Sequence, residues 1–125
     1  MKLSEAIRLG AMIRPQGFHS MFQRGRDGRL LSCALGAAWE ASGSGCVPEF
    51  GISGVVKDLT LRFPILKMTV LVPKELNFGT FPCSIQEIIF ALNDNLRWTR
   101  EQIADYVAEV EAMSETKKEE LACVS

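Results

Sequence analysis

The chain has 125 residues, an apolar content of 47% and a charged content of 23%. These values are typical of a globular protein and argue against a disordered one, so we expect residues 1–125 to form a single domain. No run approaches the roughly 18 consecutive apolar residues of a membrane helix. No apolar segment predicts a secretory signal either, so we expect a cytoplasmic protein that does not enter a membrane.

The net charge of −1 conceals an uneven distribution along the chain. Residues 1–30 carry six Lys or Arg against two acids, whereas residues 101–125 carry two Lys against seven acids. Two ends of opposite sign can attract each other within one fold or between subunits, although the ends of helices often carry solvated charge that has no function. A slightly positive mean hydropathy also leaves apolar surface that an oligomer interface would cover.

The first thirty residues predict a helix followed by a hairpin. Apolar residues recur at helical spacing over residues 3–13, and Pro15 ends this pattern because the residue before a proline avoids the helical conformation. Asp27 and Gly28 then predict a tight turn between two short apolar segments. A small β-hairpin is therefore expected within residues 19–31.

A second helix should follow at once, with Ser32 as its N-cap and Gly43 just after its last turn. Residues 43–54 are rich in Gly and Ser and predict a loop. Residues 55–63 place apolar side chains on one face of a short helix, and residues 66–72 suggest a lone strand or an extended buried segment.

The C-terminal third carries the clearest local signals. Ser84 and Glu87 have the spacing of a capping box, and so do Thr99 and Gln102. Two helices joined by a short link should therefore form a helical hairpin. Residues 115–125 are charged and should be frayed or helical at the surface. The fold expected overall is mainly α, with four or five helices and a minor β element.

Three arginines on the predicted turn are the candidate anion-binding residues. Arg24, Arg26 and Arg29 fall together, and guanidinium groups bind phosphate or carboxylate in a bidentate manner. The same residues are also explained by a solvated turn that protects a hairpin edge. Because the chain as a whole is not basic, binding of nucleic acid or another anion is an alternative rather than the leading hypothesis.

A thiol-dependent enzyme is a second alternative. Cys33 would lie in the first turn of a predicted helix, where the helix dipole favours a thiolate, and His19 is the only histidine. However, apolar neighbours suggest that Cys33 is an inert core residue. A zinc site is not favoured, because no C-x-x-C pair occurs among the four cysteines, which stand at positions 33, 46, 83 and 123.

No other pattern indicates chemistry. Residues 99–106 have the pattern of the first helix of a helix-turn-helix, but residues 107–113 contain no turn residue and are acidic, which favours a capped amphipathic helix instead. Phosphate-loop, nucleophile-elbow and zinc-protease motifs are absent from the sequence. The sequence therefore predicts no catalytic residue, no cofactor and no metal site.

Several segments resemble a group of small bacterial and phage proteins of unsettled function. Those proteins carry an LND segment followed by W-[ST]-R-E-x-I-A near their C-terminus, and this chain has Leu92-Asn93-Asp94 and then Trp98-Thr99-Arg100-Glu101-Gln102-Ile103-Ala104. Residues 3–11 and 33–38 are similar to their N-terminal halves, and residues 43–83 have no counterpart. The resemblance implies a bacterial type of protein but no activity, so it assigns no catalytic residue.

The leading hypothesis is thus a non-enzymatic protein that acts by association, as a homo-oligomer or with an unidentified protein partner. It rests on the missing catalytic constellation, the surplus apolar surface and the ends of opposite charge.

Overall fold

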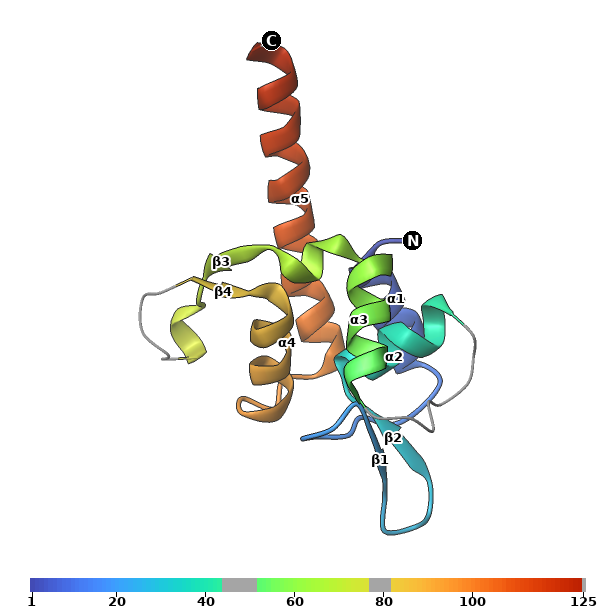
Figure 1. Cartoon of the computed structure of the whole chain (residues 1–125). Coiled ribbons are helices and arrows are strands. Elements are labelled where there is room, and N and C mark those ends of the chain that lie inside the picture. The colour runs from blue at the N-terminus through green and yellow to red at the C-terminus, as the bar shows by residue number, and fades with distance from the viewer. Residues whose placement is uncertain (44–51, 77–81, 125) are drawn as a thin grey trace.

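The computed structural model describes residues 1–43, 52–76 and 82–124, and it confirms a mainly helical fold with a minor β element (Figure 1). Within these ranges there are five α-helices, two short 3-10 helices and two antiparallel hairpins. The helices are α1 (Leu3–Ala11), α2 (Ala34–Ser42), α3 (Ile52–Arg62), α4 (Ile85–Asp94) and α5 (Arg100–Val124). The strands are β1 (Phe22–Arg24), β2 (Leu30–Ser32), β3 (Thr69–Leu71) and β4 (Pro82–Ser84).

Helix α1 packs closely against α2 because a glycine stands at their contact. A Cβ atom on Gly10 would clash with the backbone carbonyl of Ala37. The helix ends at Ala11, two residues before the predicted end, because the Met12 and Ile13 N–H groups donate to carbonyls only three residues back. Such bonds tighten the last turn and finish the helix.

The first hairpin forms where Asp27 and Gly28 predicted it. Phe22 pairs with Ser32 and Arg24 with Leu30, and Gly28 has the positive φ of 84° that the turn needs.

The predicted N-cap of α2 is wrong by one residue. Ser32 is the last residue of β2, and its hydroxyl accepts a hydrogen bond from Arg100. The cap is Cys33, whose Sγ accepts from the Gly36 N–H at 3.4 Å. The sequence favoured Ser32 because serine is a common N-cap residue. In the structure the Ser32 hydroxyl instead accepts a hydrogen bond from Arg100, which is distant in the sequence. Gly43 does follow the last helical residue, Ser42, as expected.

The middle of the chain is more regular than predicted. Residues 44–51 of the predicted loop lie outside the described residues, but residues 52–54 belong to α3, so that helix begins three residues before the predicted start. The strand predicted within residues 66–72 is β3, and it is not alone, because Val70 pairs with Cys83 of β4. Two 3-10 helices, η1 (Pro64–Lys67) and η2 (Lys74–Leu76), flank β3.

Both predicted capping boxes are present. Ser84 Oγ accepts from the Glu87 N–H at 3.2 Å, and Thr99 Oγ1 accepts from the Gln102 N–H at 3.1 Å. Helices α4 and α5 run antiparallel, as the predicted helical hairpin requires (Figure 1). Helix α5 has no break after its first turns and continues to Val124, and its C-terminal half projects beyond the rest of the molecule (Figure 1).

One apolar core joins all five helices. Ile7 of α1, Leu35 of α2, Leu59 of α3, Ile88 of α4 and Val107 of α5 are each exposed by 1% or less. The helical periodicity of the sequence predicted these five residues on buried faces, but it also included Ile13, which is 52% exposed.

The oppositely charged ends of the sequence meet within the fold. Lys2 pairs with Glu115 at 3.1 Å, and Arg8 contacts both Glu101 at 3.2 Å and Asp105 at 2.7 Å. These exposed ion pairs run along the contact between α1 and α5. Basic residues of the N-terminal segment thus pair with acidic residues of α5 in the same chain, and each exposed pair contributes little to stability.

Candidate functional site

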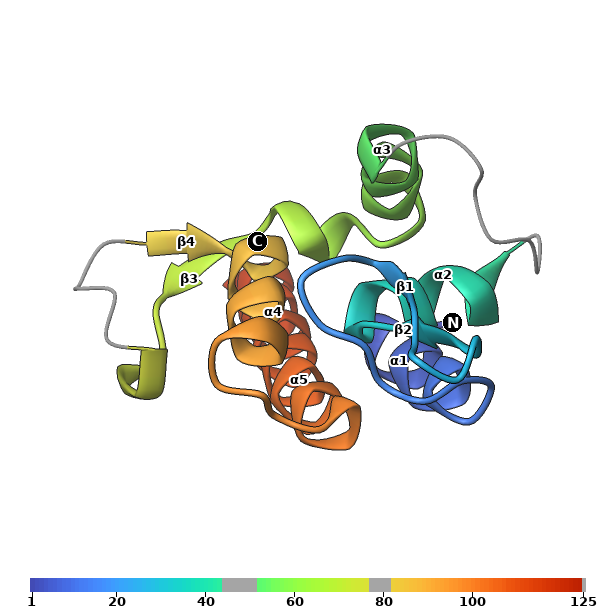
Figure 2. The ribbon, with the colours of Figure 1, turned by 90° about the horizontal axis from the view of Figure 1, so that it is seen from below.

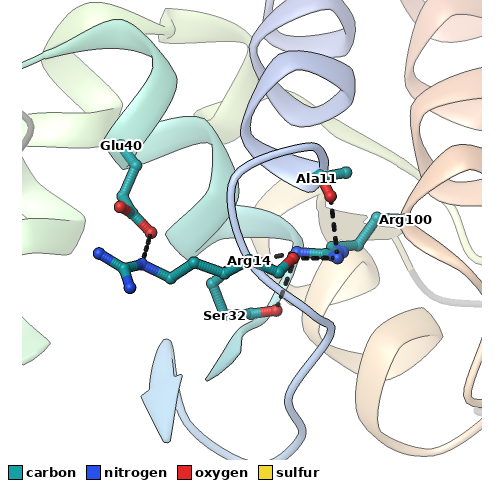
Figure 3. A network of polar contacts seen from close by, with 5 residues as sticks. All are labelled: Ala11, Arg14, Ser32, Glu40 and Arg100. Atoms are coloured by element: carbon teal, nitrogen blue, oxygen red, sulfur yellow. Dashed lines mark hydrogen bonds and ion pairs between the residues drawn. The ribbon is translucent and has the colours of Figure 1, made fainter. Parts of the chain in front are cut away.

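A buried arginine at the start of α5 organises the loop that follows α1 (Figure 3). Arg100 is only 7% exposed. Its Nη2 donates to the carbonyl oxygens of Arg14 at 2.7 Å and Ala11 at 3.3 Å, and its Nη1 donates to Ser32 Oγ at 3.0 Å. Burial lowers the pKa of this guanidinium, but arginine stays charged in proteins. Neutral carbonyl and hydroxyl oxygens therefore solvate the cation.

Arg14 extends this arrangement to α2. Its Nε donates to Glu40 Oε1 at 2.7 Å, and the Glu40 side chain is only 3% exposed (Figure 3). A buried carboxylate needs such a partner because its desolvation is costly. We call these five residues the Arg100 network: Ala11, Arg14, Ser32, Glu40 and Arg100.

A buried asparagine holds the next part of the same loop. Asn93 Oδ1 accepts from Gln16 Nε2 at 3.1 Å and from the Ala34 N–H at 3.2 Å. Its Nδ2 donates to the Gly17 carbonyl at 3.0 Å and to Asp94 Oδ1 at 2.8 Å. Every hydrogen-bonding position of the amide is used. Asn93 and Arg100 thus both hold the loop that follows α1.

The loop held in this way presents an apolar surface. Ala11 and Arg14, whose carbonyls Arg100 fixes, stand on either side of Met12 and Ile13. Met12 is 84% exposed, and Ile13 and Leu9 are about half exposed. We call Leu9, Met12 and Ile13 the α1 apolar turn. Three exposed apolar residues thus lie within five positions of one another, next to a backbone that Arg100 holds in place.

The candidate arginines of the hairpin have different environments. Arg24 Nη1 donates to the Gly28 carbonyl at 2.8 Å, and Arg29 pairs with Asp27 at 2.6 Å. The bonds from Arg29, led by its backbone N–H, lower the pKa of the Asp27 carboxyl. Arg26 is exposed and has no side-chain partner in the part of the chain that the structure describes. The turn is therefore ordered by two arginines and offers the third to solvent.

The proposed thiol site lacks the properties of a nucleophile. Cys33 is 2% exposed, and burial raises the pKa of its thiol to about 11. The thiol thus stays protonated at neutral pH, although it lies at the start of a helix. His19 is exposed, and no hydrogen bond joins it to Cys33 among the described residues; its backbone N–H donates to Asp94 at 2.9 Å.

A groove of about 450 Å³ runs beside the first turns of α5, and sequence reasoning did not find it. Trp98, Tyr106 and three polar residues of α5 line it together with Pro73, which follows β3. Burial raises the pKa of the Tyr106 hydroxyl, and the Glu109 carboxylate adds to that rise. We call this site the α5 groove, and its lining residues are Pro73, Trp98, Gln102, Asp105, Tyr106 and Glu109.

The spacing of these residues held a signal for the groove. Positions 102, 105, 106 and 109 share one face of α5, and Trp98 lies two residues before that helix, but Pro73 joins them only through tertiary packing. Two aromatic residues therefore lie beside two carboxylates in this groove. Asp105 is engaged by Arg8, but no hydrogen bond or ion pair engages the Glu109 carboxylate among the described residues.

No family model, curated protein or solved structure matches this chain. Within the described ranges, no three His, Cys, Asp or Glu side chains gather as metal ligands would. None of the helices described combines the length and the apolar character needed to cross a membrane.

Proposed function

We propose that this protein acts by association with other protein surfaces, in the first place with further copies of itself, and not as an enzyme. The observation that carries the proposal is the α1 apolar turn. Its residues are exposed, yet the Arg100 network fixes the backbone on both sides of Met12 and Ile13. A rigid surface loses little conformational entropy on binding, which favours association.

Sedimentation equilibrium over a range of concentrations tests the proposal. We expect the wild-type chain to be oligomeric and Met12→Glu to weaken its association by about 10- to 100-fold, because burial of one Met side chain contributes about 1.5–3 kcal/mol. Leu71→Glu is the matched control, since Leu71 is 72% exposed and lies on β3, away from this turn. Circular dichroism should show that both variants remain folded.

A wild-type chain that stays monomeric at every concentration, and that retains no protein partner on purification, would contradict the proposal. Equal effects of Met12→Glu and Leu71→Glu would show that the α1 apolar turn has no special role.

Binding of nucleic acid is the second candidate function, and the observation that favours it is the free guanidinium of Arg26. The three hairpin arginines would contact phosphates, so binding should weaken steeply with salt. Fluorescence anisotropy with a labelled duplex and a labelled single strand would measure this. If the candidate is correct, Arg26→Ala should reduce the salt dependence, and binding that is absent or insensitive to salt would exclude it.

A further inference from the structure

We infer that the α5 groove binds the arginine turn of a second copy of this chain, with Arg26 as the inserted side chain. The inference rests on the proposed self-association and adds a second contact between copies, separate from that of the α1 apolar turn. Its basis is the complementary chemistry of a free guanidinium and a groove that offers aromatic rings and a free carboxylate.

The groove has the composition of a site for an organic cation. A guanidinium stacks favourably on the faces of Trp and Tyr rings, and a neighbouring carboxylate accepts its hydrogen bonds. Trp98 and Tyr106 supply the rings, and Glu109 supplies a carboxylate that no described cation occupies. A volume of about 450 Å³ has room for one arginine side chain.

The arginine turn has the matching properties. The Gly25 N–H donates to the Arg29 carbonyl at 2.7 Å, and the Gly28 N–H donates to the Gly25 carbonyl at 3.0 Å. The contacts of Arg24 and Arg29 order the turn further. Arg26 therefore projects from a preorganised hairpin, which extends beyond the helices at the end opposite to the α5 extension (Figure 1).

The two surfaces do not meet within one chain. Figure 2 shows the β1–β2 hairpin on one side of the α4–α5 pair and β3 with the segment that follows it on the other. Helix α1 lies on the same side as the hairpin in both views (Figures 1 and 2). A contact between hairpin and groove therefore joins different surfaces of two copies, and such a head-to-tail contact leads to a ring or a filament rather than an isologous dimer.

Charge-reversal variants test the inference, with their association measured by sedimentation velocity at low and at high salt. We expect Arg26→Glu and Glu109→Arg each to weaken association by roughly 10-fold or more, and the double variant Arg26→Glu/Glu109→Arg to recover most of that loss. Lys57→Glu is the control, because Lys57 is exposed on α3 and the same charge reversal there should leave association unchanged. The wild-type assemblies should exceed a dimer and shrink as salt increases.

The outcomes separate this inference from the proposed function. If the chain associates and Met12→Glu dissociates it, but neither reversal has an effect, the groove contact is refuted and self-association stands. A closed dimer would refute the head-to-tail arrangement in the same way. If Glu109→Arg alone weakens association and the double variant is no better, the groove binds a cation other than Arg26, and the inference is overturned. A chain that remains monomeric throughout refutes this inference, and it refutes the proposed function as well if no protein partner is retained on purification.

Discussion

The guanidinium of Arg100 donates to the backbone carbonyl of Arg14 at 2.7 Å, while the Arg14 side chain turns away to Glu40 (Figure 3). The two guanidinium groups do not face each other, because Arg100 contacts the backbone carbonyl of Arg14 and the Arg14 guanidinium pairs with Glu40. This contact joins the start of α5 to the end of the α1 segment, and the apolar turn depends on it.

Replacement of Arg100 should destabilise the fold. We expect Arg100→Ala to lower the free energy of unfolding by about 3 kcal/mol, because four oxygens that lie in or near the core lose a charged donor. Arg100→Lys should recover only part of this loss, since an ammonium lacks the planar fork. Urea unfolding measures both, and Arg26→Ala on the exposed turn is the control. A loss below about 0.5 kcal/mol for Arg100→Ala would contradict this role.

Asn93 should be sensitive to a change that preserves its shape. Asn93→Asp replaces a donor with a carboxylate oxygen that would face the Gly17 carbonyl and the Asp94 carboxylate. We expect a loss of about 2–4 kcal/mol in urea unfolding near neutral pH, with partial recovery at acidic pH as the carboxyl is protonated. The same change at exposed Asn95 should have little effect. Equal losses at the two positions would show that the bonds of Asn93 contribute nothing specific.

Gly10→Ala should destabilise the protein although alanine favours helices. The added Cβ would clash with the Ala37 backbone, which cannot move without shifting α2. We expect thermal unfolding to show a net loss of about 1–3 kcal/mol, against the gain of about 1 kcal/mol that this change gives in an exposed helix. At Gly28, alanine has open space, and any loss there reflects only its positive φ. An unchanged or higher melting temperature for Gly10→Ala would mean that the Ala37 backbone does not pack directly against Gly10.

Cys33 should react slowly with iodoacetamide. Because burial raises the pKa of its thiol to about 11, almost no thiolate exists at neutral pH. Mass spectrometry after labelling should show slower modification of Cys33 in the native protein than of free cysteine, and full modification after unfolding. A native rate equal to or above that of free cysteine would revive the thiol-enzyme hypothesis.

The same pKa shift sets a pH dependence. The folded pKa lies above the unfolded value near 9, so burial of the neutral thiol stabilises the fold fully below pH 9, and this contribution is lost as the pH rises toward 11. We expect Cys33→Ser or Cys33→Ala to remove this part of the alkaline loss of stability. Urea unfolding between pH 8 and about 10.5 measures it.

The sequence predicted those elements whose signals are local. Ser84 and Thr99 begin helices because their partners lie three residues away, and Gly28 forms its turn from its own conformational freedom. The cap of α2 was misassigned because the competing partner of Ser32 lies 68 residues along the chain. Strand β4 was not predicted, because residues 82–84 form a strand by pairing with β3, and no local pattern in the sequence indicates that pairing.

The candidate site was predictable only in part, for the same reason. The arginines of the hairpin were visible as a cluster, but only the fold shows that Arg24 and Arg29 serve the turn and that Arg26 is free. The α5 groove needs Pro73 beside Trp98, a proximity that no spacing encodes.

Asn93 and Arg100 form hydrogen bonds with residues that are far away in the sequence, and this separation affects how the chain folds as it is synthesised. The carbonyls of Ala11, Arg14 and Gly17 find their partners 76 to 89 residues later. During translation the loop after α1 thus emerges long before the groups that satisfy it, and contacts of such large sequence separation form late. The N-terminal half should therefore depend on water or a chaperone until residues 93–100 leave the ribosome, and the apolar turn should take its final shape only then.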